Sequence, residues 1–146
     1  MTEKNNEKLS LRLFIDLTRA NMTIQRELSS KVKNSGVTLT QFSVLEALYH
    51  KGDLCVGDIK DLILTTSGNI TVVISNLEKD KYIKRIKDNN DKRKFIISIT
   101  EKGKKLVEEL YPIQKETIME IFSLISEKDK SIIAQNLNSI WYKKTI

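Results

Sequence analysis

The fold is decided by residues 59–100, which read IKDLILTTSGNITVVISNLEKDKYIKRIKDNNDKRKFIISIT. A short helical pattern ends near its start, covering Val56–Leu64 with Ile59, Leu62 and Ile63 expected to point inward. The polar residues Thr65–Gly68 then form a tight turn, and a second helical pattern covers Ser67–Lys81. Two helices joined by so short a turn must pack against each other at a steep angle, as in a helix-turn-helix.

Two β-like runs follow the second helix. They cover Tyr82–Lys87 and Lys94–Thr100, and the polar stretch Asp88–Arg93 joins them. Apolar and basic residues partly alternate along both runs, which indicates a hairpin with one buried face. Helix, turn, helix and charged hairpin in this order predict a winged helix-turn-helix, in which one helix enters the DNA major groove beside a basic wing.

The second helix carries two unlike faces. Its apolar residues recur at i, i+3, i+4 and i+7, namely Ile70, Val73, Ile74 and Leu77. The opposite face is short, polar and nearly uncharged, with Asn69, Thr71, Val72, Ser75 and Asn76. A merely solvated face would more often carry Lys and Glu, which are better helix formers. We therefore interpret it as a DNA-reading face; the alternative is an ordinary exposed helix face.

The excess positive charge lies around the predicted wing. Lys79–Lys105 holds eleven basic and four acidic residues, a net +7, against +6 for the whole chain. Arg93 suits a narrow, electronegative minor groove, and Asp91 can hold its guanidinium or the loop in place; a plain surface turn is the alternative. The predicted DNA contacts are Thr38, Thr40, Ser67, Gly68, Asn69, Thr71, Val72, Ser75, Asn76, Asp91, Lys92, Arg93 and Lys94.

Long helices are predicted on both sides of this unit. The first covers residues 9–33, with the stripe Leu9, Leu13, Leu17, Ala20, Ile24, Leu28 and Val32, and Gly36 suits a left-handed cap after it. Next comes a helix opened by the capping box Thr38–Gln41 and closed at Lys51–Asp53. Leu54–Val56 can add a third strand to the hairpin.

The C-terminal part is expected to be helical as well. Thr100 is suited to cap a long helix, which Pro112 should kink, and a last helix is expected from Glu127 to Lys143. The predicted fold class is mainly α with a small β-hairpin wing (α+β). One domain, residues 1–146, then contains a winged lobe (37–100) and a helical dimerisation region (9–34 and 101–144).

Composition narrows the function. The chain has 146 residues, is 40% hydrophobic and 30% charged, and contains one Cys and one His. We expect a cytoplasmic protein without a secretory signal, a membrane span, a disulfide, a metal or another cofactor. The catalytic sets and phosphate loops typical of enzymes are not evident, so we expect a non-enzyme. A winged-helix protein–protein adaptor without DNA binding is the main alternative, and membrane binding would need a basic amphipathic helix instead.

Three further features have two interpretations each. Cys55 lies among apolar residues, so it either packs inertly or senses redox chemistry or electrophiles. His50 ends a helix and is either a cap or surface residue or a ligand. A small effector is predicted to bind between the long helices and the lobe. The residues predicted to line its pocket are Phe14, Leu17, Phe42 and Tyr49; the alternative is that they are ordinary core residues.

Several motifs, in this order and spacing, resemble the MarR family of bacterial transcription regulators over nearly the whole chain. They are Gly36–Phe42, Ser67–Thr71, Leu77–Lys79, Asp91–Arg93 and Thr100–Gly103. The stretch Leu48–Asp53 and the Ser-Gly-Asn-Ile-Thr helix start are similar to the subgroup that senses quinones and related electrophiles.

The resemblance implies a homodimer in which the first, fifth and sixth helices interleave. It also implies two lobes on a pseudo-palindromic operator in double-stranded DNA, and repression relieved by a small phenolic or quinone-like effector or by cysteine oxidation. Two departures are visible. The first helix lacks the cysteine of the peroxide-sensing branch, and Lys79-Asp80-Lys81-Tyr82 lacks the glycine common in the turn before the hairpin.

Overall fold

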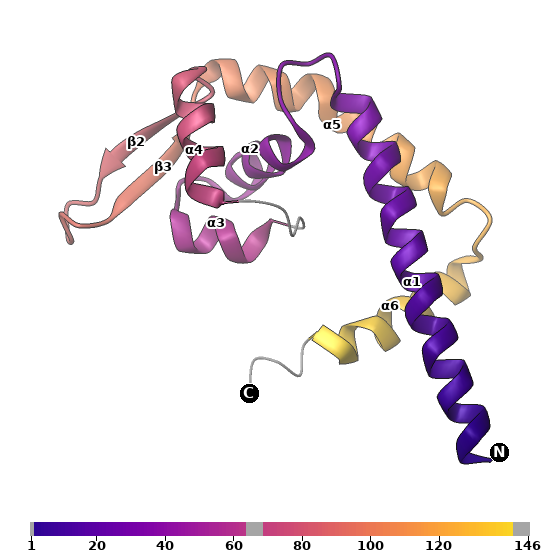
Figure 1. Cartoon of the computed structure of the whole chain (residues 1–146). Coiled ribbons are helices and arrows are strands. Elements are labelled where there is room, and N and C mark those ends of the chain that lie inside the picture. Colours follow the sequence, from indigo (N-terminus) through magenta and orange to yellow (C-terminus); the bar gives the residue numbers. More distant parts are fainter. Residues whose placement is uncertain (1, 64–68, 142–146) are drawn as a thin grey trace.

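The computed structural model describes residues 2–63 and 69–141 (Figure 1). It confirms a mainly helical chain with one small sheet, and residues 64–68, which include Ser67 and Gly68, lie outside the described residues. The elements in chain order are α1 (Glu3–Val32), α2 (Leu39–Lys51), β1 (Leu54–Cys55), α3 (Val56–Leu62), α4 (Ile70–Lys79), β2 (Ile83–Lys87), β3 (Phe95–Ile99), α5 (Glu101–Ile121) and α6 (Glu127–Trp141).

A lobe made of α2, α3, α4 and the sheet occupies one end of the molecule, and α5 runs from it toward α1 (Figure 1). Its core gathers around α2, because Phe42, Val44, Leu45 and Leu48 are all buried on that helix. The other elements contribute apolar side chains to the same cluster, among them Ile59, Ile74, Leu77, Ile83, Ile97 and Val107. Helix α4 and the β2–β3 hairpin, which is the predicted wing, therefore pack on one shared core.

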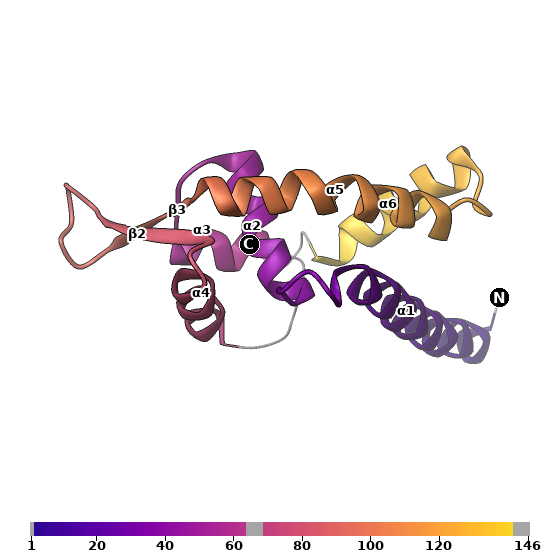
Figure 2. The same ribbon diagram turned by 90° about the horizontal axis from the view of Figure 1, so that it is seen from above.

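The sheet has three antiparallel strands in the order β1-β3-β2. Leu54 pairs with Ile97 on one edge of β3, and Arg85 pairs with Ile97 on the other. The third strand predicted at Leu54–Val56 is thus confirmed over Leu54–Cys55. Seen from above, the hairpin projects from the lobe at the end of the molecule opposite α1 (Figure 2).

Predicted helix ends are found where local chemistry dictates them. Thr38 and Gln41 form the capping box of α2, and Thr100 caps α5 by accepting a hydrogen bond from the Gly103 amide at 3.2 Å. Gly36 and Gly52 have φ angles of +89° and +85°, which only glycine adopts without strain. α5 continues through Pro112 to Ile121.

The turn from α4 into β2 is a Schellman motif. The Tyr82 amide donates to the Leu77 carbonyl (2.9 Å) and the Lys81 amide to the Glu78 carbonyl (3.0 Å), while Tyr82 and Leu77 are both buried. Lys81 occupies the left-handed position, with φ +64°. Lys81 lies in the turn where the MarR family commonly has a glycine. The turn keeps its geometry here, but with a lysine whose backbone is strained at a positive φ.

Helix α5 begins in close contact with the hairpin. A Cβ atom on Gly103 would lie 2.4 Å from the Tyr82 carbonyl oxygen and 2.7 Å from Cγ1 of Ile99. That oxygen is held by hydrogen bonds from the Thr100 amide and the Thr100 hydroxyl, both at 3.0 Å. Glycine is required here because nothing larger fits between the helix and the strand entry.

Other boundaries and burials differ from expectation. α1 begins at Glu3 rather than at residue 9. α4 is described from Ile70 with Asn69 as its N-cap, and the predicted start at Ser67 lies outside the described residues. Leu62 is 40% exposed rather than inward. Leu9 and Leu13 of the predicted first-helix stripe are exposed in the single chain, as are Ile113 on α5 and Leu124 after it. Within the described ranges no helix is long and apolar enough to cross a membrane.

Candidate nucleic-acid interface

The outward face of α4 is exposed as predicted. Asn69, Thr71, Val72, Ser75 and Asn76 are all on the surface, while Ile74 and Leu77 are buried behind them. Asn69 is the N-cap rather than a helical residue, since its Oδ1 accepts the Thr71 amide at 3.0 Å. Its side-chain oxygen therefore serves the helix, and its amide nitrogen is the group it can offer to DNA. The predicted contacts Ser67 and Gly68 fall outside the described residues.

Arg85 joins the wing to α4. Its Nη2 donates to the Ser75 hydroxyl at 3.1 Å, and its Nε lies 3.3 Å from a carboxylate oxygen of Glu78, an ion pair without hydrogen-bond alignment. The guanidinium also lies 5.9 Å from the centre of the Phe95 ring on β3. From the sequence, Arg85 was recognised only as one of the basic residues around the wing. Its position on β2, beside Ser75 and Glu78 of α4, is visible only in the structure.

The wing tip is ordered by its acidic residues and leaves its basic residues exposed. Asp91 Oδ1 accepts the Arg93 amide at 3.0 Å and lies 3.4 Å from Arg93 Nε. The Arg93 side chain is nonetheless 93% exposed. Lys92 and Lys94 are exposed beside it. The arrangement presents three cations at the end of the hairpin, at a distance from the lobe core.

Thr38 and Thr40 lie at the start of α2, away from the hairpin. Thr38 Oγ1 accepts the Gln41 amide at 3.2 Å, and the Gln41 side chain accepts the Thr38 amide at 2.8 Å. Thr40 is half-buried. Thr38 thus has a structural role in the capping box, and DNA contact by either threonine stays a prediction.

Cys55 is neither a core residue nor fully exposed. It is half-buried as the N-cap of α3, where its Sγ donates to Asp58 Oδ2 at 3.0 Å and accepts the Asp58 amide at 3.5 Å. It lines a hollow of about 380 Å³ together with Arg93 and Lys94 of the wing. Its surroundings thus differ from those of a core residue, and both interpretations of Cys55, inert packing and sensing, stay predictions.

A cavity of about 500 Å³ opens between α1, α2 and α5. Its polar lining includes Gln25, Ser43, Glu46, Tyr111 and Gln114, and its apolar lining includes Ile24, Leu28, Leu39, Phe42 and Ile118. Burial raises the pKa of Glu46, against the opposing effect of His50. Gln114 is buried and donates to the Leu28 carbonyl at 3.0 Å.

Of the predicted effector residues only Phe42 lines this cavity. Phe14 is 68% exposed two turns before the part of α1 that borders it, and Leu17 is half-buried outside it. Tyr49 turns away to donate to Glu108 at 3.2 Å, a hydrogen bond that raises the pKa of the phenol. Apolar spacing alone could not separate the cavity wall from the rest of the helix. The available signal was the polar Gln114, which lies four residues after Leu110 and so on the same buried face of α5.

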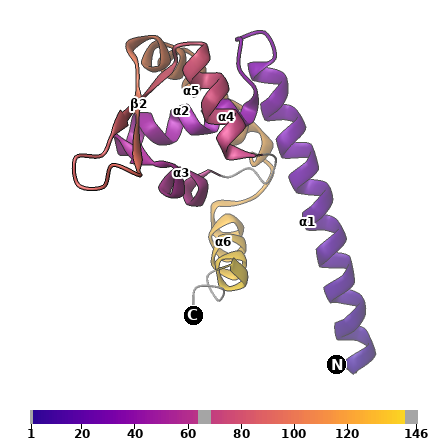
Figure 3. The ribbon, with the colours of Figure 1, turned by 60° about the vertical axis from the view of Figure 1, so that its left-hand side comes forward.

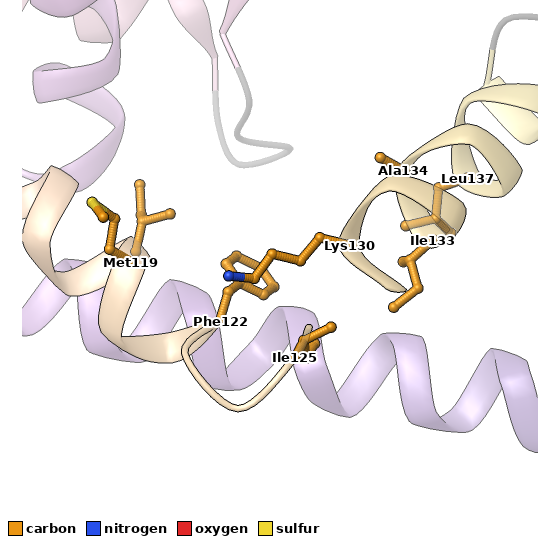
Figure 4. Close-up of a pocket in the computed structure, with 8 residues that line it drawn as sticks. Met119, Phe122, Ile125, Lys130, Ile133, Ala134 and Leu137 are labelled. Carbon is orange, nitrogen blue, oxygen red and sulfur yellow. The ribbon is translucent and has the colours of Figure 1, made fainter. Parts of the chain in front are cut away.

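A second cavity, of about 410 Å³, separates the end of α5 from α6. It is lined by Met119, Phe122, Ile125, Ile133 and Leu137 among others, and Lys130 extends across it (Figure 4). α6 buries no residue in the single chain, and Figure 3 shows it standing apart from α1. Apart from Lys130, the residues that line this hollow are apolar.

Comparison with known proteins agrees with this geometry. A family model described as transcriptional regulator SarA/Rot matches residues 27–110. The chain is 37% identical over 140 residues to the HTH-type transcriptional regulator MhqR of Bacillus subtilis, covering 96% of this chain and 93% of that protein.

Two solved structures share the fold. One is a mutant of Escherichia coli MarR complexed with operator DNA, with a TM-score of 0.78, 18% identity, and coverage of 96% of this chain and 99% of that one. The other is the organohalide-sensing regulator RdhR-CbdbA1625 in its 2,4-dichlorophenol-bound form, with a TM-score of 0.79, 19% identity, and coverage of 96% and 83%.

Proposed function

The chain belongs to the MarR/SarA family of winged helix-turn-helix transcriptional regulators, which are DNA-binding proteins and not enzymes, and from that premise we propose a specific mode of action. The protein is a cytoplasmic homodimer that binds a pseudo-palindromic operator and represses nearby genes. A small phenolic or quinone-like ligand, or an electrophile, releases it from DNA.

One observation carries the DNA-reading part of this proposal. The uncharged, exposed face of α4 lies beside a basic wing, and Arg85 ties the two together through Ser75. Phosphate contacts position a protein on DNA, and short polar side chains on a groove-facing helix read bases. An adaptor that binds protein would not need cations concentrated at the wing tip.

Fluorescence-anisotropy titration tests it. Purified protein is titrated against the duplex upstream of its own gene and against a scrambled duplex, each at two salt concentrations. We expect tighter and salt-sensitive binding to the upstream duplex. Absence of binding at low salt would refute the proposal and favour the adaptor alternative.

Exposed apolar residues on the long helices support the homodimer. Leu9 and Leu13 on α1 are 50% and 55% exposed, and Ile132 and Ile133 on α6 also face solvent in the single chain. Burial of such a stripe against a second copy is the ordinary way to remove it from water. A symmetric dimer would place its two α4 helices about 34 Å apart, one turn of DNA.

Light scattering on a size-exclusion column tests the assembly. Wild type should have twice the mass of one chain, and Leu13→Glu should shift toward monomer and lose operator affinity. Thr23→Glu, at an exposed uncharged position of the same helix, is the control for one added acidic residue on α1. A monomeric wild type that still binds a palindrome specifically would contradict the proposal.

The cavity between α1, α2 and α5 is the proposed effector site. Its volume suits a single aromatic ring with substituents, and Phe42 with Ser43 and Gln114 offers both apolar and hydrogen-bonding surface. The structurally similar RdhR-CbdbA1625 binds 2,4-dichlorophenol, which makes that compound a rational probe.

Release is measured by adding 2,4-dichlorophenol or a benzoquinone to the anisotropy complex. Loss of anisotropy in wild type, and its suppression in Gln114→Leu, would support a ligand in the cavity. Cys55→Ser separates the two routes, because only release by covalent modification of the thiol should be lost in that variant. Full retention of the complex with every probe would contradict release by this ligand class.

A further inference from the structure

An apolar side chain lies at the centre of the reading face. Val72 is 53% exposed, and Ser75, Asn76 and Lys79 follow it at i+3, i+4 and i+7, so the four share one stripe of α4. A β-branched residue at an exposed helical position adds nothing to helix stability, and its methyl groups are not packed in the core. On a surface otherwise made of hydroxyl, amide and amine groups, it offers a contact only to another apolar group.

Ser75 beside it has a defined hydrogen-bonding role. Its Oγ accepts a hydrogen bond from Arg85 Nη2 at 3.1 Å, and Arg85 is itself held by Glu78 and Phe95. A hydroxyl that accepts from a guanidinium still has its own proton to donate. Ser75 therefore presents a donor to whatever lies in front of α4, and the positive charge of Arg85 strengthens that donor.

The pair matches one base. In the major groove thymine offers the C5 methyl group and, next to it, the O4 acceptor. Cytosine presents an amino donor instead, adenine an amino donor beside its N7 acceptor, and guanine two acceptors, and none of these three bases carries a methyl group. We propose that Val72 and Ser75 together read one thymine in each half-site, with Val72 against its methyl group and Ser75 donating to O4. This inference rests on the proposed operator binding and specifies what α4 recognises.

Base analogues test each half of the contact separately. The tightest duplex is selected from a random pool, and each thymine is replaced singly by uracil, which removes only the methyl group. Wild type should lose affinity about fourfold per half-site at one thymine position, the effect of one buried methyl group. In Val72→Ala the thymine-to-uracil ratio there should fall to about one. Lys79→Ala, on the same face, should bind more weakly while keeping the ratio.

The hydrogen bond is tested at the same position. A 5-methylcytosine paired with guanine keeps the methyl group and replaces the O4 acceptor by an amino donor. Wild type should prefer thymine over it, and Ser75→Ala should reduce that preference about tenfold.

Each failure has a distinct meaning. Indifference of wild type to uracil at every position of a tightly bound duplex would overturn the inference but leave operator binding intact. An unchanged thymine-to-uracil ratio in Val72→Ala would overturn it in the same way. If no sequence is enriched from the pool, both this inference and the proposed function are overturned.

Discussion

Replacement of Gly103 by alanine should destabilise the protein although alanine is the better helix former. The added methyl group would lie 2.4 Å from the Tyr82 carbonyl oxygen and 2.7 Å from Ile99 Cγ1. Overpacking of this kind costs about 1–3 kcal/mol, and the carbonyl cannot move without weakening its two hydrogen bonds from Thr100. The gain in helix propensity returns about 1 kcal/mol. We expect a net loss of up to about 2 kcal/mol.

Urea denaturation followed by circular dichroism measures this balance. The midpoint should fall by up to about 1 M with an unchanged slope, given about 2 kcal/mol per M for a chain of this size. Gly57→Ala is the matched control, because the nearest atom to its new Cβ would be Cys55 Sγ at 3.9 Å. The control should be neutral or slightly more stable. Both variants are compared at one protein concentration, since the stability of the proposed homodimer would depend on it.

A midpoint for Gly103→Ala equal to or above wild type would refute the reasoning. It would mean that the contact between α5 and the hairpin entry relaxes at little cost, and that the glycine is not required by close approach.

Four other changes have defined outcomes. Lys81→Gly should stabilise the protein by about 1 kcal/mol in the same denaturation assay, because φ is +64° there, whereas Lys81→Ala should bring no such gain. Arg93→Ala should weaken binding to all duplexes and lower the salt slope by about one unit per subunit; an unchanged slope would rule out a phosphate contact. Thr71→Ala should erode discrimination between operator and random DNA by about 1–3 kcal/mol if it reads a base, while equal loss on both would count against base reading. Burial raises the pKa of Glu46 above its ordinary value of 4.5, so the native state holds the proton more tightly than the unfolded state does. Wild type therefore loses stability as the pH rises from 4.5 through the raised pKa of the folded protein. Glu46→Gln should therefore be more stabilising at pH 7 than at pH 4.5, and equal effects at the two pH values would contradict this.

Several features of the fold could be predicted from interactions between residues close together in the sequence. The capping box at Thr38, the N-cap at Thr100 and the left-handed Gly36 depend on side chains within a few residues of each other, and all three were predicted correctly. The α4 start was less accurate, because Asn69 can serve either as a first helical residue or as a cap, and only the backbone path decides between them.

The cavity wall was harder to predict. Phe14, Leu17, Phe42 and Tyr49 share the apolar character and spacing of core residues, but only Phe42 borders the space between α1, α2 and α5. The direction in which a helix faces its neighbours depends on crossing angles and on contacts distant in sequence. Periodicity identifies a face without saying which element covers it.

The sequence by itself determined the order of the elements, the uncharged reading face and the basic wing, because periodicity, capping and charge are local properties. Only the tertiary structure decided how the wing meets α4. Arg85 reaches Ser75 and Glu78 because β2 turns back beside α4 after the Schellman turn at Lys81. That contact joins residues ten and seven positions apart across a reversal of the chain. The close approach of α5 to the hairpin entry at Gly103 is a second contact that no local pattern encodes.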